Sequence, residues 1–164
     1  MIRSMIKNIL LKANIVVTRP PGQFNVARIK LRHLKHRGLV VSAAVDVGAA
    51  EGDWAREFSE IFPASRILCI EPRVEAQSSL LALSKSNPRV EVAECLLGAI
   101  EGEALFHSAG HQSSIFGTST GAHFGHSSPI RTMPLDGLLA ARNFPAPDFI
   151  KLDVQGAELL CLEG

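Results

Sequence analysis

The sequence contains few cysteines and no long apolar run. Its three cysteines, Cys69, Cys95 and Cys161, are widely spaced and form no CxxC pair. An odd number without paired spacing argues against a disulfide framework or a zinc site and favours a reducing compartment. No apolar run reaches the roughly 18 residues of a membrane span, and the N-terminus lacks the apolar core and cleavage site of a signal peptide. We therefore expect a cytoplasmic protein without a bound metal.

Acidic residues are absent from the first 45 positions. Residues 1–38 hold nine of the seventeen Lys and Arg, whereas the rest of the chain holds eight basic and sixteen acidic residues. Apolar residues recur in the basic segment at the spacing of an amphipathic helix: Ile2, Met5, Ile6, Ile9 and Leu10. Such a helix either contacts an anionic membrane or acidic partner, or packs its apolar face on the domain; we favour packing. Because the main body is acidic, we do not expect nucleic-acid binding.

The length and composition fit one soluble globular domain with an extension. The chain has 164 residues, of which 46% are hydrophobic and 20% charged, enough to bury a sizeable core. After the breaker "TRPPG", a second basic helix is expected over residues 24–36. We therefore divide the chain into a basic helical N-terminal extension, residues 1–38, and a single domain, residues 39–164.

Strand and helix patterns alternate along the domain. Apolar, β-branched runs predict strands at residues 40–47, 67–70, 90–96 and 149–154, and amphipathic patterns predict helices at 53–62, 74–84 and from Ala157 onward. This alternation predicts an α/β fold, a Rossmann-like three-layer sandwich with a mainly parallel sheet. Ligands of such sheets bind beyond the carboxyl ends of the strands. Acids and glycines follow the predicted strands here, which indicates a site at that edge.

The stretch "AVDVGAAEGDW" joins the first predicted strand to a helix. Gly48 and Gly52 allow a ligand to approach the backbone and the free N–H groups of the helix start. A dinucleotide fingerprint would read G-x-G-x-x-G, but the middle glycine is missing, and Glu51 and Asp53 would repel a diphosphate. With Asp46 at the strand end, the turn suits a cationic ligand such as S-adenosylmethionine. The alternative is a simple tight turn in which the acids, Asp53 above all, cap the helix.

A second acid, Glu71, follows the second predicted strand, 19 residues after Gly52. A carboxylate at this position can accept hydrogen bonds from both ribose hydroxyls of a bound nucleoside. S-adenosylmethionine and nicotinamide cofactors both carry a ribose. Glu71 therefore indicates a nucleoside ligand without choosing between the two.

Candidate general bases lie after the later strands. Asp153 follows the last predicted strand, and four histidines fall in a glycine- and serine-rich segment that we expect to be a long loop between Phe106 and Ile130: His107, His111, His123 and His126. A loop of that length is usually a lid, a binding loop or disordered. Their spacings could suit a metal, but no carboxylate or cysteine lies among them. We favour solvated or substrate-facing histidines, with His107 and His111 as candidate bases.

Six motifs together resemble the FkbM-type methyltransferases: "VDVGAAEGDW", "ILCIEP", "VEVAECLLGAIEGEALF", "SSIF", "MPLDGLL" and "FIKLDVQGAELLCLEG". They occur in that family's order and spacing over about residues 40–164. These class I enzymes use S-adenosylmethionine and mostly O-methylate sugars and other secondary metabolites. The resemblance implies this cofactor and a small-molecule hydroxyl acceptor.

The resemblance also implies which residues contact the cofactor. Asp46, Gly48, Ala49 and Gly52 would line it, and Glu71 with Pro72 would hold the ribose. Glu94, Cys95 and Leu96 would lie beside the adenine, and Asp153, Gly156 and Glu158 would form the signature turn near the methyl group.

The family continues with further strands beside the one predicted at residues 149–154. We therefore expect a sheet that is incomplete at its C-terminal side, with this strand at an edge. An S-adenosylmethionine-dependent O-methyltransferase is the function we predict. The alternatives are a non-catalytic, truncated binding fragment and an NAD-dependent oxidoreductase.

Overall fold

The computed structural model describes residues 26–107, 127–154 and 156–164. The apolar pattern at residues 2–10 and the candidate base His111 lie outside these ranges, as do His123 and His126. The elements are α2 (Val26–His36), β1 (Ala43–Val47), α3 (Asp53–Ile61), β2 (Arg66–Ile70), α4 (Val74–Ser86), β3 (Val90–Ala93), β4 (Leu96–Leu97), β5 (Gly102–His107), β6 (Ser127–Met133), α5 (Leu135–Ala141), β7 (Phe149–Leu152) and α6 (Glu158–Leu162).

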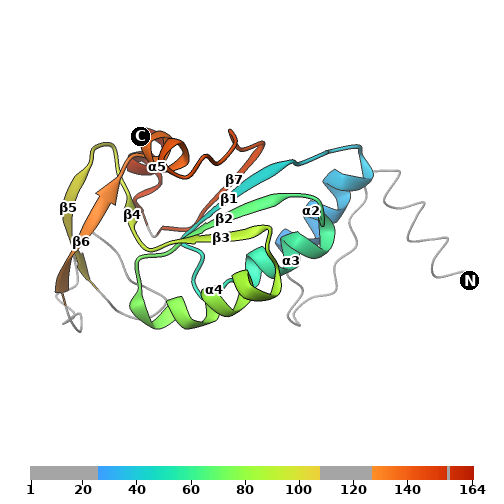
Figure 1. Cartoon of the computed structure of the whole chain (residues 1–164). Coiled ribbons are helices and arrows are strands. Elements are labelled where there is room, and N and C mark those ends of the chain that lie inside the picture. The colour runs from blue at the N-terminus through green and yellow to red at the C-terminus, as the bar shows by residue number, and fades with distance from the viewer. Residues whose placement is uncertain (1–25, 108–126, 155) are drawn as a thin grey trace, which may run out of the picture.

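Four parallel strands form the central sheet, in the order β3-β2-β1-β7 (Figure 1). They are the four strands predicted from the apolar runs, and the mainly parallel α/β fold is confirmed. The order places β7 at an edge of the sheet described here, as expected. β2 and β3 lie on one side of β1, whereas β7 lies on the other. The carboxyl ends of β1 and β7 are therefore the point where the strand order reverses, the usual ligand position in open α/β sheets.

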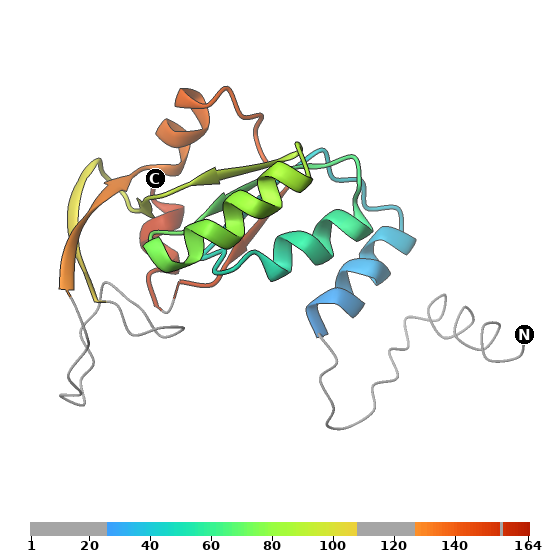
Figure 2. The same cartoon turned by 60° about the horizontal axis from the view of Figure 1, so that its bottom comes forward.

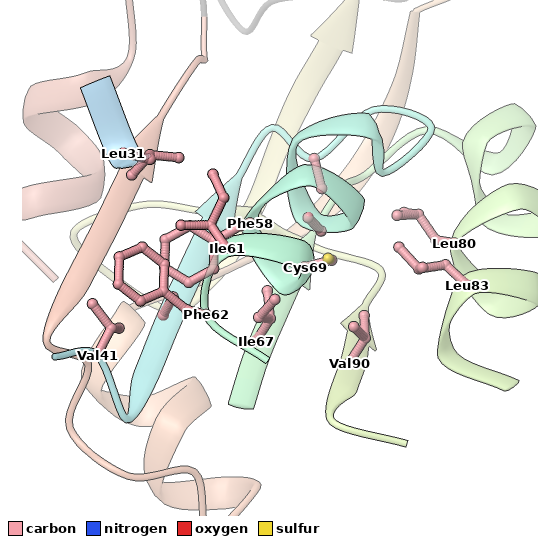
Figure 3. Close-up of a cluster of buried hydrophobic side chains, with 13 residues drawn as sticks. Leu31, Val41, Phe58, Ile61, Phe62, Ile67, Cys69, Leu80, Leu83 and Val90 are labelled. Atoms are coloured by element: carbon pink, nitrogen blue, oxygen red, sulfur yellow. The ribbon is translucent and has the colours of Figure 1, made fainter. Parts of the chain in front are cut away.

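Successive residues of each strand point to opposite faces of the sheet, and their side chains pack into two separate hydrophobic cores. On one face Ala44, Ile67 and Cys69 pack against α3, α4 and Leu31 of α2, and Figure 3 shows Phe58 and Leu80 reaching toward the sheet from the two covering helices. The opposite face packs against α5 and α6 through a second cluster that includes Val45, Leu68, Leu138 and Cys161. Helices thus cover both faces, which confirms the three-layer architecture.

The predicted strand at residues 90–96 is too long. It ends at Ala93, and Leu96–Leu97 pair instead with β6 in a second sheet of order β4-β6-β5. The break falls where Glu94 is exposed and Cys95 is buried in the second core, so the chain turns away from the central sheet. Figure 2 shows this smaller sheet to one side of the main one.

The long loop expected between Phe106 and Ile130 is also partly wrong. Its last residues begin β6, which pairs antiparallel with β5 from Gly102↔Thr132 to His107↔Ser127. The segment "SSPIRTM" has few apolar residues, so its strand character comes from the pairing with β5 and not from a periodic pattern of its own.

Helix α2 matches the second predicted basic helix and packs against α3. Leu31 is buried in the first core, Arg28 pairs with Glu60, and Lys35 donates to the Ile61 carbonyl. This segment of the basic extension therefore packs on the domain. Among the described residues, no helix is long and apolar enough to cross a membrane.

Candidate functional site

The turn after β1 is held close to the ends of both neighbouring strands. The Gly48 N–H donates to the Ile70 carbonyl across 2.9 Å, and Gly48, Ala50 and Gly52 all have positive φ. A Cβ added at Gly48 would lie 2.2 Å from the Asp153 carbonyl oxygen. Gly48 is therefore required both by its left-handed backbone and by the close approach of the segment after β7.

The start of α3 differs from the expectation that Asp53 caps it. Gly52, with φ 85°, occupies the cap position, and Asp53 is the first helical residue. The described part of the chain shows no side-chain cap hydrogen bond at this helix start, and Asp53 Oδ1 instead accepts a hydrogen bond from Arg56 at 2.7 Å. The cap prediction for Asp53 is wrong because the left-handed glycine already completes the turn.

Glu71 lies directly after β2 and is connected to the first turn. Glu71 is only 4% exposed. Oε2 accepts from the Ala50 N–H at 2.8 Å, while Oε1 accepts from the Arg73 N–H at 3.1 Å and from Arg73 Nε at 2.9 Å. A carboxylate offers about four acceptor positions, so one on Oε2 is left for a ligand. Pro72, the next residue, is buried.

Asp46 is the most deeply buried acid in the described part of the chain. It is 0% exposed, and its Oδ1 lies 2.8 Å from Lys151 Nζ. No other donor within the described ranges reaches either carboxylate oxygen. Burial raises the pKa of Asp46 to about 6, although the neighbouring Lys151 charge acts in the opposite direction. Asp46 is thus covered by protein, and among the described residues Lys151 connects it to the edge of the site.

Lys151 is a residue that the sequence reasoning missed. It lies on β7 directly opposite Asp46 on β1, and its Nζ donates to the Gly48 carbonyl at 2.9 Å and lies 3.9 Å from Asp153 Oδ2. The available signal was a single charged residue inside the otherwise apolar run "FIKL". A single charge in an otherwise apolar strand indicates a partner for that charge in the fold.

The segment after β7 contains the three residues that the family resemblance assigns to the signature turn: Asp153, Gly156 and Glu158. The Asp153 side chain is 63% exposed, and Gly156 has φ 101°. The Gly156 N–H donates to Glu158 Oε1 at 3.3 Å. Hydrogen bonds from its own N–H and from that of Gly156 lower the pKa of Glu158, so this acid is ionised beside the turn.

The residues expected near the adenine separate after β3. Glu94 is exposed, whereas Cys95 is buried and points into the second core, and burial raises the pKa of its thiol. Leu96 pairs with Thr132 in the second sheet. Glu94 and Cys95 thus directly follow β3, and Leu96 begins β4.

The structure brings three of the predicted elements together: the Gly48–Gly52 turn, Glu71 and Asp153. The candidate base His107 ends β5 in the second sheet, and its side chain lies outside the described residues. In the described ranges, no group of three or more His, Cys, Asp or Glu could hold a metal ion. The arrangement offers buried carboxylates and close backbone approach at the reversal point of the sheet.

Comparisons with known proteins show the family. The chain is similar to two solved structures. The first is a "putative caffeoyl-CoA O-methyltransferase" from Staphylococcus aureus, with a TM-score of 0.37 and 11% identity; the match covers 55% of this chain and 42% of that one. The second is precorrin-6y C5,15-methyltransferase from Geobacter metallireducens GS-15, with a TM-score of 0.34 and 18% identity; the match covers 48% of this chain and 43% of that one. The match thus spans less than half of either structure. No curated protein sequence matches. The family model described as the methyltransferase FkbM domain matches residues 46–164, most of the chain, and the protein therefore belongs to the FkbM methyltransferase family.

Proposed function

We propose that the chain binds S-adenosylmethionine across the carboxyl ends of β1, β2 and β3 and methylates a hydroxyl oxygen of a sugar or secondary metabolite. The observation that supports this most directly is the position of Glu71. Its buried carboxylate follows β2, is held against the glycine turn by the Ala50 N–H, and keeps one acceptor position for a ligand. Ribose hydroxyls are the donors that such a carboxylate binds in Rossmann-like folds.

The charges around the turn favour a cofactor without phosphate. Asp46 and Glu71 are buried acids beside it, and Glu51 lies in the turn itself. The basic side chains near the described turn are paired: Arg73 and Lys151 with these acids, and Arg56 with Asp53. No unpaired cation is therefore shown beside the described turn to meet a diphosphate. This arrangement supports S-adenosylmethionine over NAD, the cofactor of the alternative oxidoreductase.

The remaining predicted contacts follow from the order of the strands. With the ribose at Glu71 and Pro72, the adenine would lie toward β3, beside Glu94, the Cys95 backbone and Leu96. The methionine part would then lie toward β7, over Gly48, Ala49 and Gly52 and close to Asp153, Gly156 and Glu158. Asp46 would contribute through Lys151.

In methyl transfer the main task of the protein is to position the acceptor against the methyl group. Bound S-adenosylmethionine supplies an electrophilic methyl group, so holding the acceptor oxygen in line with it supplies much of the rate. A general base further speeds the reaction of an unactivated hydroxyl. Asp153 is our first candidate because its carboxylate is exposed beside the Gly48 turn; His107 and His111 are the others.

We further propose the division into a basic extension, residues 1–38, and a methyltransferase domain, residues 39–164, in the cytoplasm. The packing of α2, the second expected helix, on α3 supports packing on the domain in preference to a contact with an anionic membrane; the first expected helix lies outside the described residues.

Isothermal titration calorimetry tests the proposed function. The chain is titrated separately with S-adenosylmethionine, S-adenosylhomocysteine and NAD, after circular dichroism has shown that it is folded. We expect binding heat with the first two compounds and none with NAD. Binding of NAD alone would support the oxidoreductase, and no heat with any compound would support a non-catalytic fragment.

A further inference from the structure

Lys151 connects three groups that lie far apart in the sequence. Its ammonium lies 2.8 Å from Asp46 Oδ1, donates to the Gly48 carbonyl at 2.9 Å, and lies 3.9 Å from Asp153 Oδ2. The Gly48 contact alone spans 103 positions of the chain. The side chain is 20% exposed, so its charged end reaches from the buried Asp46 to the edge of the candidate site.

Neutralising Asp46 does not by itself explain this geometry. A lysine opposite Asp46 in the β1–β7 register could satisfy the buried carboxylate while its other two N–H groups pointed into solvent. Instead one of them is used on the carbonyl of Gly48, whose backbone is left-handed and in close contact with the Asp153 carbonyl. Lys151 therefore donates a hydrogen bond at the position where the Gly48 turn contacts the segment that follows β7.

We propose that Lys151 is a positioning residue that fixes the Gly48 turn and Asp153 relative to each other, and that Asp46 acts by holding Lys151 in place. This inference rests on the proposed function. If the ribose lies at Glu71 on the β2 side, the part of the ligand beyond the ribose lies toward β7, where Lys151 sets the shape of the surface. Its removal should then affect that part more than the nucleoside part.

The test compares two ligands on charge-balanced variants. S-Adenosylhomocysteine contains the amino-acid part of the ligand, whereas 5′-methylthioadenosine retains adenine and ribose without it. The double variant D46N/K151M removes both charges together, and Lys151→Arg keeps the positive charge but changes the geometry of the donor. Lys85→Met, at an exposed position near the end of α4, is the matched control. Thermal unfolding of each variant identifies those that are folded.

We expect the folded double variant to bind S-adenosylhomocysteine about tenfold or more weakly, since a hydrogen bond from a charged donor is lost. Lys151→Arg should show a smaller loss, and both variants should bind 5′-methylthioadenosine nearly as the wild-type chain does. If one of these two variants does not fold, the other is sufficient to test the positioning role of Lys151. Wild-type affinity for S-adenosylhomocysteine, or an equal loss for both ligands, would overturn the positioning role while leaving the proposed function intact. A folded wild-type chain that binds neither ligand would overturn the proposed function itself.

Discussion

The two ends of the candidate site hold their buried acids in different ways. On the β2 side Glu71 accepts three N–H groups: the backbone N–H of Ala50, 21 positions away in the turn after β1, and the backbone and guanidinium N–H groups of Arg73, two positions further on. On the β7 side Asp46 depends on one ammonium, which reaches it from a strand more than 100 positions away. Glu71 is thus supported by several neighbours, whereas Asp46 rests on a single long-range partner. This difference predicts which substitutions the protein tolerates.

Lys151→Met should have the largest effect. It leaves an uncompensated carboxylate that is 0% exposed, and breaking a buried pair in this way costs about 3–5 kcal/mol of unfolding free energy. Urea denaturation at neutral pH measures the loss, with Lys85→Met as the control. A loss close to that of the control would show that Asp46 does not depend on Lys151.

The pH dependence of stability should report Asp46 directly. Its pKa is raised from 3.8 to about 6 by burial, so between these values the folded state binds more protons than the unfolded state. Stability then falls as the pH rises, and the contribution is fully present only below the unfolded pKa. At 1.36 kcal/mol per unit this amounts to about 2–3 kcal/mol.

Comparison with Asp46→Asn isolates this contribution because other acids titrate in both proteins. Relative to the variant, the wild-type chain should lose this stability between about pH 4 and pH 7, measured by urea unfolding at each pH. A difference that stays constant, or one that increases in favour of the wild-type chain, would contradict the raised pKa.

The difference between the two acids also explains what could be predicted from the sequence. The turn around Gly48 and the position of Glu71 follow from local order, since a strand, a glycine turn and a helix are read from neighbouring residues. The Asp46–Lys151 pair depends on the register between β1 and β7, and no local pattern contains it. The same reason explains the early end of β3 and the start of β6, which are set by pairing with distant segments.

Glu71→Gln tests the β2 side of the site. The amide retains the shape and one oxygen to accept the Ala50 N–H, but it loses the charge that a ribose hydroxyl pair would meet. We expect the affinity for S-adenosylhomocysteine to fall by about 1–3 kcal/mol in calorimetry. Glu75→Gln, at an exposed glutamate in the first turn of α4, should bind as the wild-type chain does. Equal affinity for all three proteins would place the ribose elsewhere.

Arg73→Met is the counterpart of Lys151→Met on the better-supported acid, and it should have the smallest effect. Glu71 keeps the N–H groups of Ala50 and of residue 73 itself, because backbone donors survive the substitution. The loss of the charged hydrogen bond to Glu71, together with the 3.6 Å ion pair between Arg73 and Glu51, should then cost about 1.5 kcal/mol in urea denaturation, below the cost at Lys151. If the two losses were equal, two backbone donors would offer a buried carboxylate no more support than one lysine ammonium, and the contrast between the two sides of the site would be wrong.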